Sequence, residues 1–137
     1  MPHRSIVGLP LTLEGLFRPW LYQVSHGRLL LRHVAASPSE ETVDVSFFDV
    51  RGMKVRADYQ QLVVEPLVDL GEAQGLADIP GRHLGRYLFL NISDGVHHGF
   101  VVCGACSVYA GHWGSTVDPM LDPPEDRRQI LDLRPTI

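Results

Sequence analysis

Residues 86–110, RYLFLNISDGVHHGFVVCGACSVYA, contain the pattern that decides the fold. Asp94 and Gly95 are a preferred pair for a type I′ turn, because both central positions of that turn need a positive φ. On each side of the pair, apolar residues recur with the period of two that is typical of β-strands. We therefore predict a hairpin formed by residues 86–93 and 96–110.

Both faces of this predicted hairpin are apolar. With a two-residue loop, Leu88 lies opposite Val101 on one face, and Phe89 lies opposite Phe100 on the other. A strand pair that is apolar on both sides either lies between two layers of a fold or forms part of a subunit interface. The sequence leaves both alternatives open.

A glycine-containing turn at residues 26–27 predicts another hairpin, of residues 20–25 and 28–35. A two-residue loop there places Trp20 opposite His33.

A similar turn at residues 51–52 predicts a hairpin of residues 42–50 and 53–57. Asp49 then lies opposite Lys54, and this pair of opposite charges supports the register.

These segments, with a further strand at 62–65, predict a mainly β fold. We expect an antiparallel β-sandwich or a partly open barrel of about seven strands. A short C-terminal helix is expected at 127–133, because prolines and acidic residues just before it favour a helix start. The length fits a single domain spanning residues 1–137, with its core at about 16–134 and residues 1–10 extended or frayed.

Composition and charge narrow the functional classes. The chain is 45% hydrophobic and 20% charged, which is ordinary for a globular protein. Its net charge of -4 argues against nucleic-acid binding, which needs a concentrated positive surface. No apolar run approaches the roughly 18–20 residues of a membrane helix, and the N-terminus lacks the features of a signal peptide. We expect a cytoplasmic protein with no membrane segment.

Cys103, Cys106 and nearby His98 are a candidate metal site, because thiolate and imidazole ligands together suit tetrahedral zinc. In an unbroken strand the two cysteines point to opposite faces, with Cα atoms about 10 Å apart. That geometry permits neither a shared metal nor a disulfide unless Gly104 breaks the strand. We expect the thiols to pack as small apolar groups and expect no cofactor, with zinc as the alternative.

Arg82, His83 and Arg86 are a candidate anion site in the connection over 67–85, although a solvated basic cluster is the commoner meaning of such residues. We find no Gly-x-Ser-x-Gly motif, no matched Ser/His/Asp spacing and no phosphate loop, so no catalytic residue is predicted. A hydrolase stays an alternative, because a triad assembled from distant positions leaves no local signature.

The sequence does not identify a function. Its apolar faces favour a non-catalytic, β-rich module that binds a protein partner or a second copy of the chain, although the same residues could fill a second layer of the fold. A metal- or small-molecule-binding protein is the alternative from another class. The candidate interface residues are Tyr87, Phe89, Phe100, Leu21 and Leu30.

Overall fold

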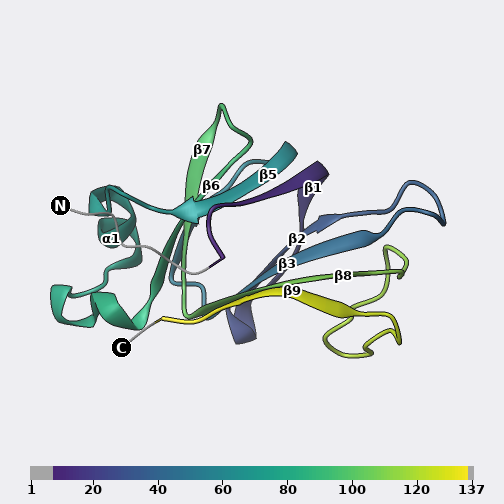
Figure 1. Ribbon diagram of the computed structural model, residues 1–137. Helices are drawn as coiled ribbons and strands as arrows, with labels where there is room; N and C mark the ends of the chain where they lie inside the picture. The colour runs from purple at the N-terminus through teal and green to yellow at the C-terminus, as the bar shows by residue number, and fades with distance from the viewer. Residues whose placement is uncertain (1–7, 136–137) are drawn as a thin grey trace.

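The computed structural model describes residues 8–135, and antiparallel β-strands dominate it (Figure 1). Within these residues, nine strands form one open sheet in the order β4-β7-β6-β5-β1-β2-β3-β8-β9. The strands are β1 (Leu11–Gln23), β2 (Arg28–His33), β3 (Thr42–Phe48), β4 (Gly52–Lys54), β5 (Tyr59–Pro66), β6 (Leu88–Ser93), β7 (His98–Cys103), β8 (Ala105–Gly111) and β9 (Arg128–Leu133). The helices are α1 (Gly71–Ala77) and two 3-10 segments, η1 (Val24–His26) and η2 (Gly81–Arg86).

Strand β1 divides the sheet into two halves. Its residues 11–17 pair with β5, whereas residues 18–23 pair with β2. Register shifts in both ladders mark the region where β1 changes partners, as expected for bulges that bend a strand. Figure 1 shows the β5–β6–β7 half turned against the β2–β3–β8–β9 half.

The main core contains side chains from both halves of the sheet. Its most deeply buried members include Phe17, Leu31, Val45, Phe47, Tyr59, Leu62, Leu90, Ile92 and Val101. The prediction of a mainly antiparallel β fold is confirmed, but the described residues form nine strands rather than about seven.

The hairpin predicted at residues 51–52 is wrong. β3 pairs with β2 and β8, whereas β4 pairs with β7 in the other half of the sheet. The chain crosses between the halves at Asp49, whose φ of 52° lies in the left-handed region. Asp49 therefore does not face Lys54 but lies beside Arg51, with 2.9 Å between Oδ1 and Nε.

The hairpin predicted at residues 26–27 forms between β1 and β2, but its loop is longer than expected. η1 and Gly27, which has a φ of 55°, connect the strands in place of a two-residue turn. Tyr22 consequently lies opposite Leu29, and Trp20 falls at a register shift instead of pairing with His33.

The hairpin predicted at Asp94 and Gly95 forms between β6 and β7 with its register moved by two residues. The Asp94 carboxylate accepts the backbone N–H groups of Val96 at 2.9 Å and His97 at 2.7 Å, which stabilises a longer loop. Leu88 therefore pairs with Cys103. Because the shift is even, each residue keeps its predicted face of the sheet.

The strand predicted over 96–110 breaks at Gly104, where the chain crosses between the halves a second time. β7 ends before this glycine and β8 begins after it, in the other half of the sheet. The Gly104 amide donates to the Phe48 carbonyl at 2.8 Å, and a Cβ at residue 104 would lie 3.1 Å from the Asp49 Cβ. The two crossings therefore pack against each other.

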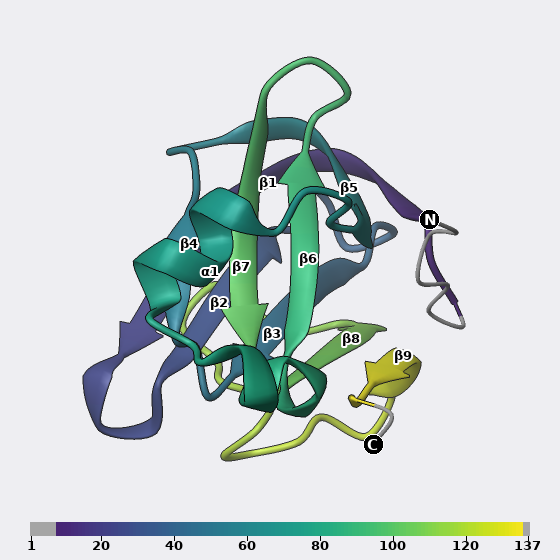
Figure 2. The same cartoon turned by 90° about the vertical axis from the view of Figure 1, so that its left-hand side faces the viewer.

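A second apolar cluster covers the outer face of β6 and β7. In Figure 2, α1 lies across β7, and η2 lies close to where β6 begins and β7 ends. The buried members of this cluster are Ala73, Ile79, Phe89, Phe100 and Val102. The hairpin is apolar on both faces because it lies between the main core and this second cluster.

The outer face of β2 and β3 is polar, and it anchors the covering loop, residues 112–127. Buried Arg32 donates to both carboxylate oxygens of Asp44, at 2.7 and 2.8 Å. Arg32 also donates to the carbonyl oxygens of Ser115 at 2.9 Å and Val117 at 2.8 Å. One buried guanidinium therefore ties the covering loop to the sheet.

The predicted C-terminal helix at 127–133 is wrong, because residues 128–133 form β9 at the end of the sheet. β9 pairs with β8, and Leu133 lies opposite Cys106. Leu131 and Leu133 pack against the main core while Ile130 is 42% exposed, which is the alternation of a strand. No helix within residues 8–135 is long and apolar enough to cross a membrane.

Candidate functional site

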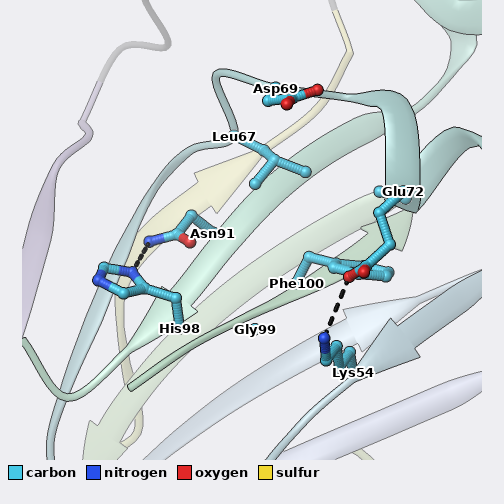
Figure 3. Close-up of a pocket in the computed structure, with 9 residues that line it drawn as sticks. Lys54, Leu67, Asp69, Glu72, Asn91, His98, Gly99 and Phe100 are labelled. Atoms are coloured by element: carbon cyan, nitrogen blue, oxygen red, sulfur yellow. Dashed lines mark hydrogen bonds and ion pairs between the residues drawn. The ribbon is translucent and has the colours of Figure 1, made fainter. Parts of the chain in front are cut away.

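A groove of about 150 Å³ lies on the outer face of β6 and β7, beside the start of α1 (Figure 3). Such a volume accommodates one benzene-sized group. The groove therefore fits a single side chain of a ligand. Its lining residues are Lys54, Leu67, Asp69, Glu72, Ala73, Asn91, His98, Gly99 and Phe100.

The apolar part of the groove is a gap at the edge of the second cluster. Ala73 and Phe100 are both buried members of that cluster. Gly99 is buried beside them, and a Cβ at this position would overlap the carbonyl oxygen of Lys54. Strand β4 can approach β7 this closely because residue 99 is glycine.

A hydrogen-bonded chain of three polar residues lies along one side of the groove. Asn91 Nδ2 lies 3.1 Å from Glu65 Oε1 and 3.2 Å from His98 Nδ1. The amide group has two N–H donors, so Asn91 donates to both partners when His98 Nδ1 is unprotonated. Within the described chain, His98 Nε2 has no hydrogen-bond partner and is free to meet a ligand.

Two carboxylates and one ammonium group lie at the rim. Lys54 Nζ is 3.2 Å from Glu72 Oε1, in an ion pair whose side chains are 62% and 67% exposed. Asp69 Oδ1 accepts the backbone N–H of Gly71 at 3.0 Å, which places this carboxylate just before the first turn of α1. Asp69 and Glu72 are exposed residues, so a ligand can reach both.

The five predicted interface residues do not form one exposed surface. Leu30, Phe89 and Phe100 are buried inside the molecule, and Leu21 is half-buried. Tyr87 is also half-buried, with the Arg51 guanidinium 5.5 Å from its ring centre. Of the five, Phe100 lines the groove.

The two cysteines do not point to opposite faces, because the chain breaks at Gly104 between them. Cys103 and Cys106 both lie in the main core, and both are free thiols. Burial raises the pKa of Cys103 to about 12 and raises the pKa of Cys106 well above its usual value. Thiols held in the protonated form are poor metal ligands and poor nucleophiles.

His98 is exposed at the start of β7 and is not brought to the thiols. His98 therefore does not share a site with the two thiols. Across residues 8–135, we find no group of three His, Cys, Asp or Glu side chains that could hold a metal ion.

The three candidate anion-binding residues, Arg82, His83 and Arg86, lie together on η2, outside the groove lining. The arginines are exposed and His83 is half-buried. Loss of solvent and the positive charges of Arg86 and Arg82 lower the pKa of His83. The positive charges of Arg82 and Arg86 therefore lie near His83 and disfavour its protonated form.

The groove itself was missed at the level of the sequence, because its sides come from β4, the β5–α1 connection, α1 and the β6–β7 hairpin. The available signal was the pair of acids Asp69 and Glu72 beside apolar residues of the 67–85 connection. No family model, curated protein or solved structure matches this chain.

Proposed function

We propose that this chain is a non-catalytic binding module that recognises a protein partner through the groove beside α1. The supporting observation is an open groove whose lining combines the buried side chains of Ala73 and Phe100 with exposed charged side chains. Ligand sites commonly combine apolar walls with a few placed polar groups. The groove has this composition.

The size of the groove favours a protein partner over a free small molecule. Sites for drug-sized molecules usually measure about 300–1,000 Å³, whereas this groove measures about 150 Å³. In protein interfaces, by contrast, a few anchor side chains filling pockets supply most of the binding energy. One such anchor fits here, with the rest of the partner lying over the rim.

The chemistry of the lining favours binding over catalysis. No serine, threonine or cysteine lines the groove within the described residues. Ser93 lies opposite His98 in the β6–β7 ladder, but its hydroxyl is buried and accepts the backbone N–H of Gly95 at 3.2 Å, and within the described residues no hydrogen bond joins it to His98. The pair therefore lacks the contact by which a base activates a nucleophile. The proposal places module and partner in the cytoplasm, where Cys103 and Cys106 remain reduced.

A blocked groove tests this proposal. In the Asp69→Cys variant a bulky maleimide label is attached at the rim, and in a matched Asp122→Cys variant the same label is attached to the exposed covering loop. The native thiols do not compete for the label, because they are buried and protonated. Peptides from a random displayed library are first selected on the wild-type protein.

We expect the selected peptides to bind the wild type and the labelled Asp122→Cys variant equally, and to bind the labelled Asp69→Cys variant at least tenfold more weakly. Equal binding to both labelled variants would place the contact elsewhere and refute the proposal. A selection that enriches no sequence would also refute it.

A further inference from the structure

The charges around the groove are predominantly negative. Asp69 and Glu72 line it, and a third carboxylate, that of Glu65, accepts a hydrogen bond from the lining residue Asn91. Among the described lining residues, Lys54 is the single lysine or arginine. An acidic side chain entering the groove would meet repulsion, whereas a positively charged one would meet two exposed carboxylates.

The apolar part of the groove suits the other half of a basic side chain. Lysine and arginine lay their methylene stems along apolar surface while the charged head stays near water or a carboxylate. Half-buried Leu67 and the small exposed part of Phe100 supply such a surface, and Figure 3 shows both between Asn91 and the rim acid Glu72. A purely apolar side chain would use this surface but not the carboxylates.

We propose that the groove takes a lysine or arginine side chain of the protein partner, with its stem on Phe100 and Leu67 and its charged head at Asp69 and Glu72. This inference rests on the proposed function, since it names the residue type that the binding module recognises.

Lys54 already shows that the rim accepts an ammonium group. Its Nζ lies 3.2 Å from Glu72 Oε1, yet both side chains are more than half exposed. An ion pair this exposed is weak and easily exchanged. Lys54 therefore acts as an internal competitor, which the partner's basic side chain displaces from Glu72.

This competition predicts opposite effects from two neighbouring substitutions. Lys54→Gln removes the competitor and makes the groove more negative, so a basic ligand binds more tightly. Glu72→Gln removes a carboxylate that receives the cation, so the same ligand binds more weakly. Both substitutions replace an exposed side chain with glutamine, which is close in size to lysine and to glutamate. A Glu125→Gln variant, on an exposed residue of the covering loop, is the matched control.

The probes are acetylated, amidated pentapeptides with one central lysine, arginine, norleucine or glutamate between glycine and serine residues. Their dissociation constants are measured by ligand-observed NMR at low salt. We expect the lysine or arginine peptide to bind best, with the comparison of the two identifying the preferred head group. We expect about two- to fivefold tighter binding to Lys54→Gln and about two- to fivefold weaker binding to Glu72→Gln, the range of an exposed ion pair.

Two results would overturn the inference. If the norleucine peptide binds as well as the basic peptides and neither substitution matters, the groove takes an apolar anchor; the proposed function then survives, because the blocked-groove experiment tests it separately. If none of the peptides binds to the wild type or to Glu125→Gln while both proteins are folded, the inference of a basic anchor is wrong. Tighter binding to Lys54→Gln together with weaker binding to Glu72→Gln supports it.

Discussion

Replacing Asp44 with alanine tests the buried ion pair that fixes the covering loop. The side chains of Arg32 and Asp44 are each 1% exposed, and two hydrogen bonds of 2.7 and 2.8 Å join them. In the Asp44→Ala variant the guanidinium stays buried, with the carbonyl oxygens of Ser115 and Val117 as its remaining acceptors. Removing one member of such a buried pair costs about 3–5 kcal/mol of unfolding free energy.

Urea unfolding followed by tryptophan fluorescence measures this loss. Trp20 is a suitable reporter, because its Nε1 donates to the Ser115 carbonyl at 3.0 Å and its ring centre lies 5.8 Å from the Arg32 guanidinium. With a urea dependence of about 2 kcal/mol per molar, the midpoint should fall by about 2 M.

Glu41→Ala is the control for Asp44→Ala, because Glu41 pairs with Arg128 at the surface and its loss should leave the midpoint close to that of the wild type. The double variant Arg32→Met with Asp44→Leu removes both charges of this pair and leaves neither buried without its partner, so it should lose less stability than Asp44→Ala alone. If Asp44→Ala unfolds at the same urea concentration as Glu41→Ala, the buried pair does not stabilise the loop as described.

Four further predictions concern other parts of the fold. Gly99→Ala should detach β4 from β7 and speed hydrogen exchange of the Lys54 region, because the added Cβ overlaps the Lys54 carbonyl oxygen; unchanged exchange would contradict that close approach. Backbone N–H groups of His97 and Val96 lower the pKa of Asp94, so its contribution to stability is present above about pH 4 and declines as the pH falls below the usual value of 3.8; Asp94→Asn should remove this part of the acid dependence in thermal unfolding, and an unaltered pH profile would count against it. Cys103 and Cys106 should react with a thiol reagent at pH 8 only after denaturant is added, since burial raises both pKa values; rapid labelling of the native protein would show that the core opens. Protein purified without chelator should contain no stoichiometric zinc, and its Tm should not change with EDTA, whereas one bound zinc per chain would restore the metal alternative.

The strand pattern allowed much of the fold to be predicted, because alternation determines which side of a sheet a residue faces even when the register is unknown. Leu88 and Phe89 lie on the two predicted faces although the loop at Asp94 is longer than a two-residue turn. The loop length depends on the Asp94 carboxylate accepting two backbone N–H groups, a contact that a glycine-based turn rule does not include.

The connections between the two halves of the sheet could not be predicted from local pattern. Glycine at residue 52 and at residue 104 indicated a turn and a possible break, but a change of direction does not reveal whether the next strand pairs with the last one. That choice depends on distant partners, since β4 pairs with β7 and β8 pairs with β3. The cysteine geometry was wrong for the same reason, because it assumed an unbroken strand across Gly104.

The candidate site was only partly predictable. Phe100 and His98 were identified, but as members of an exposed interface and of a metal site, and the structure places both on the lining of the groove. The acids Asp69 and Glu72 reach them because α1 packs across β7, which is a tertiary contact between segments about 30 residues apart. A pattern of neighbouring residues does not predict a contact between segments so far apart in the sequence.

Amide chemical-shift mapping tests the central claim, that the groove beside α1 is where this module binds a basic side chain. Isotope-labelled wild-type protein is titrated with the lysine-centred peptide, and the arginine-centred peptide is used in parallel. We expect saturable shifts concentrated at Asp69, Glu72, Asn91 and Gly99, with the covering loop unchanged. Shifts that gather on η2 or on the covering loop, or no saturable shift with either peptide, would contradict it.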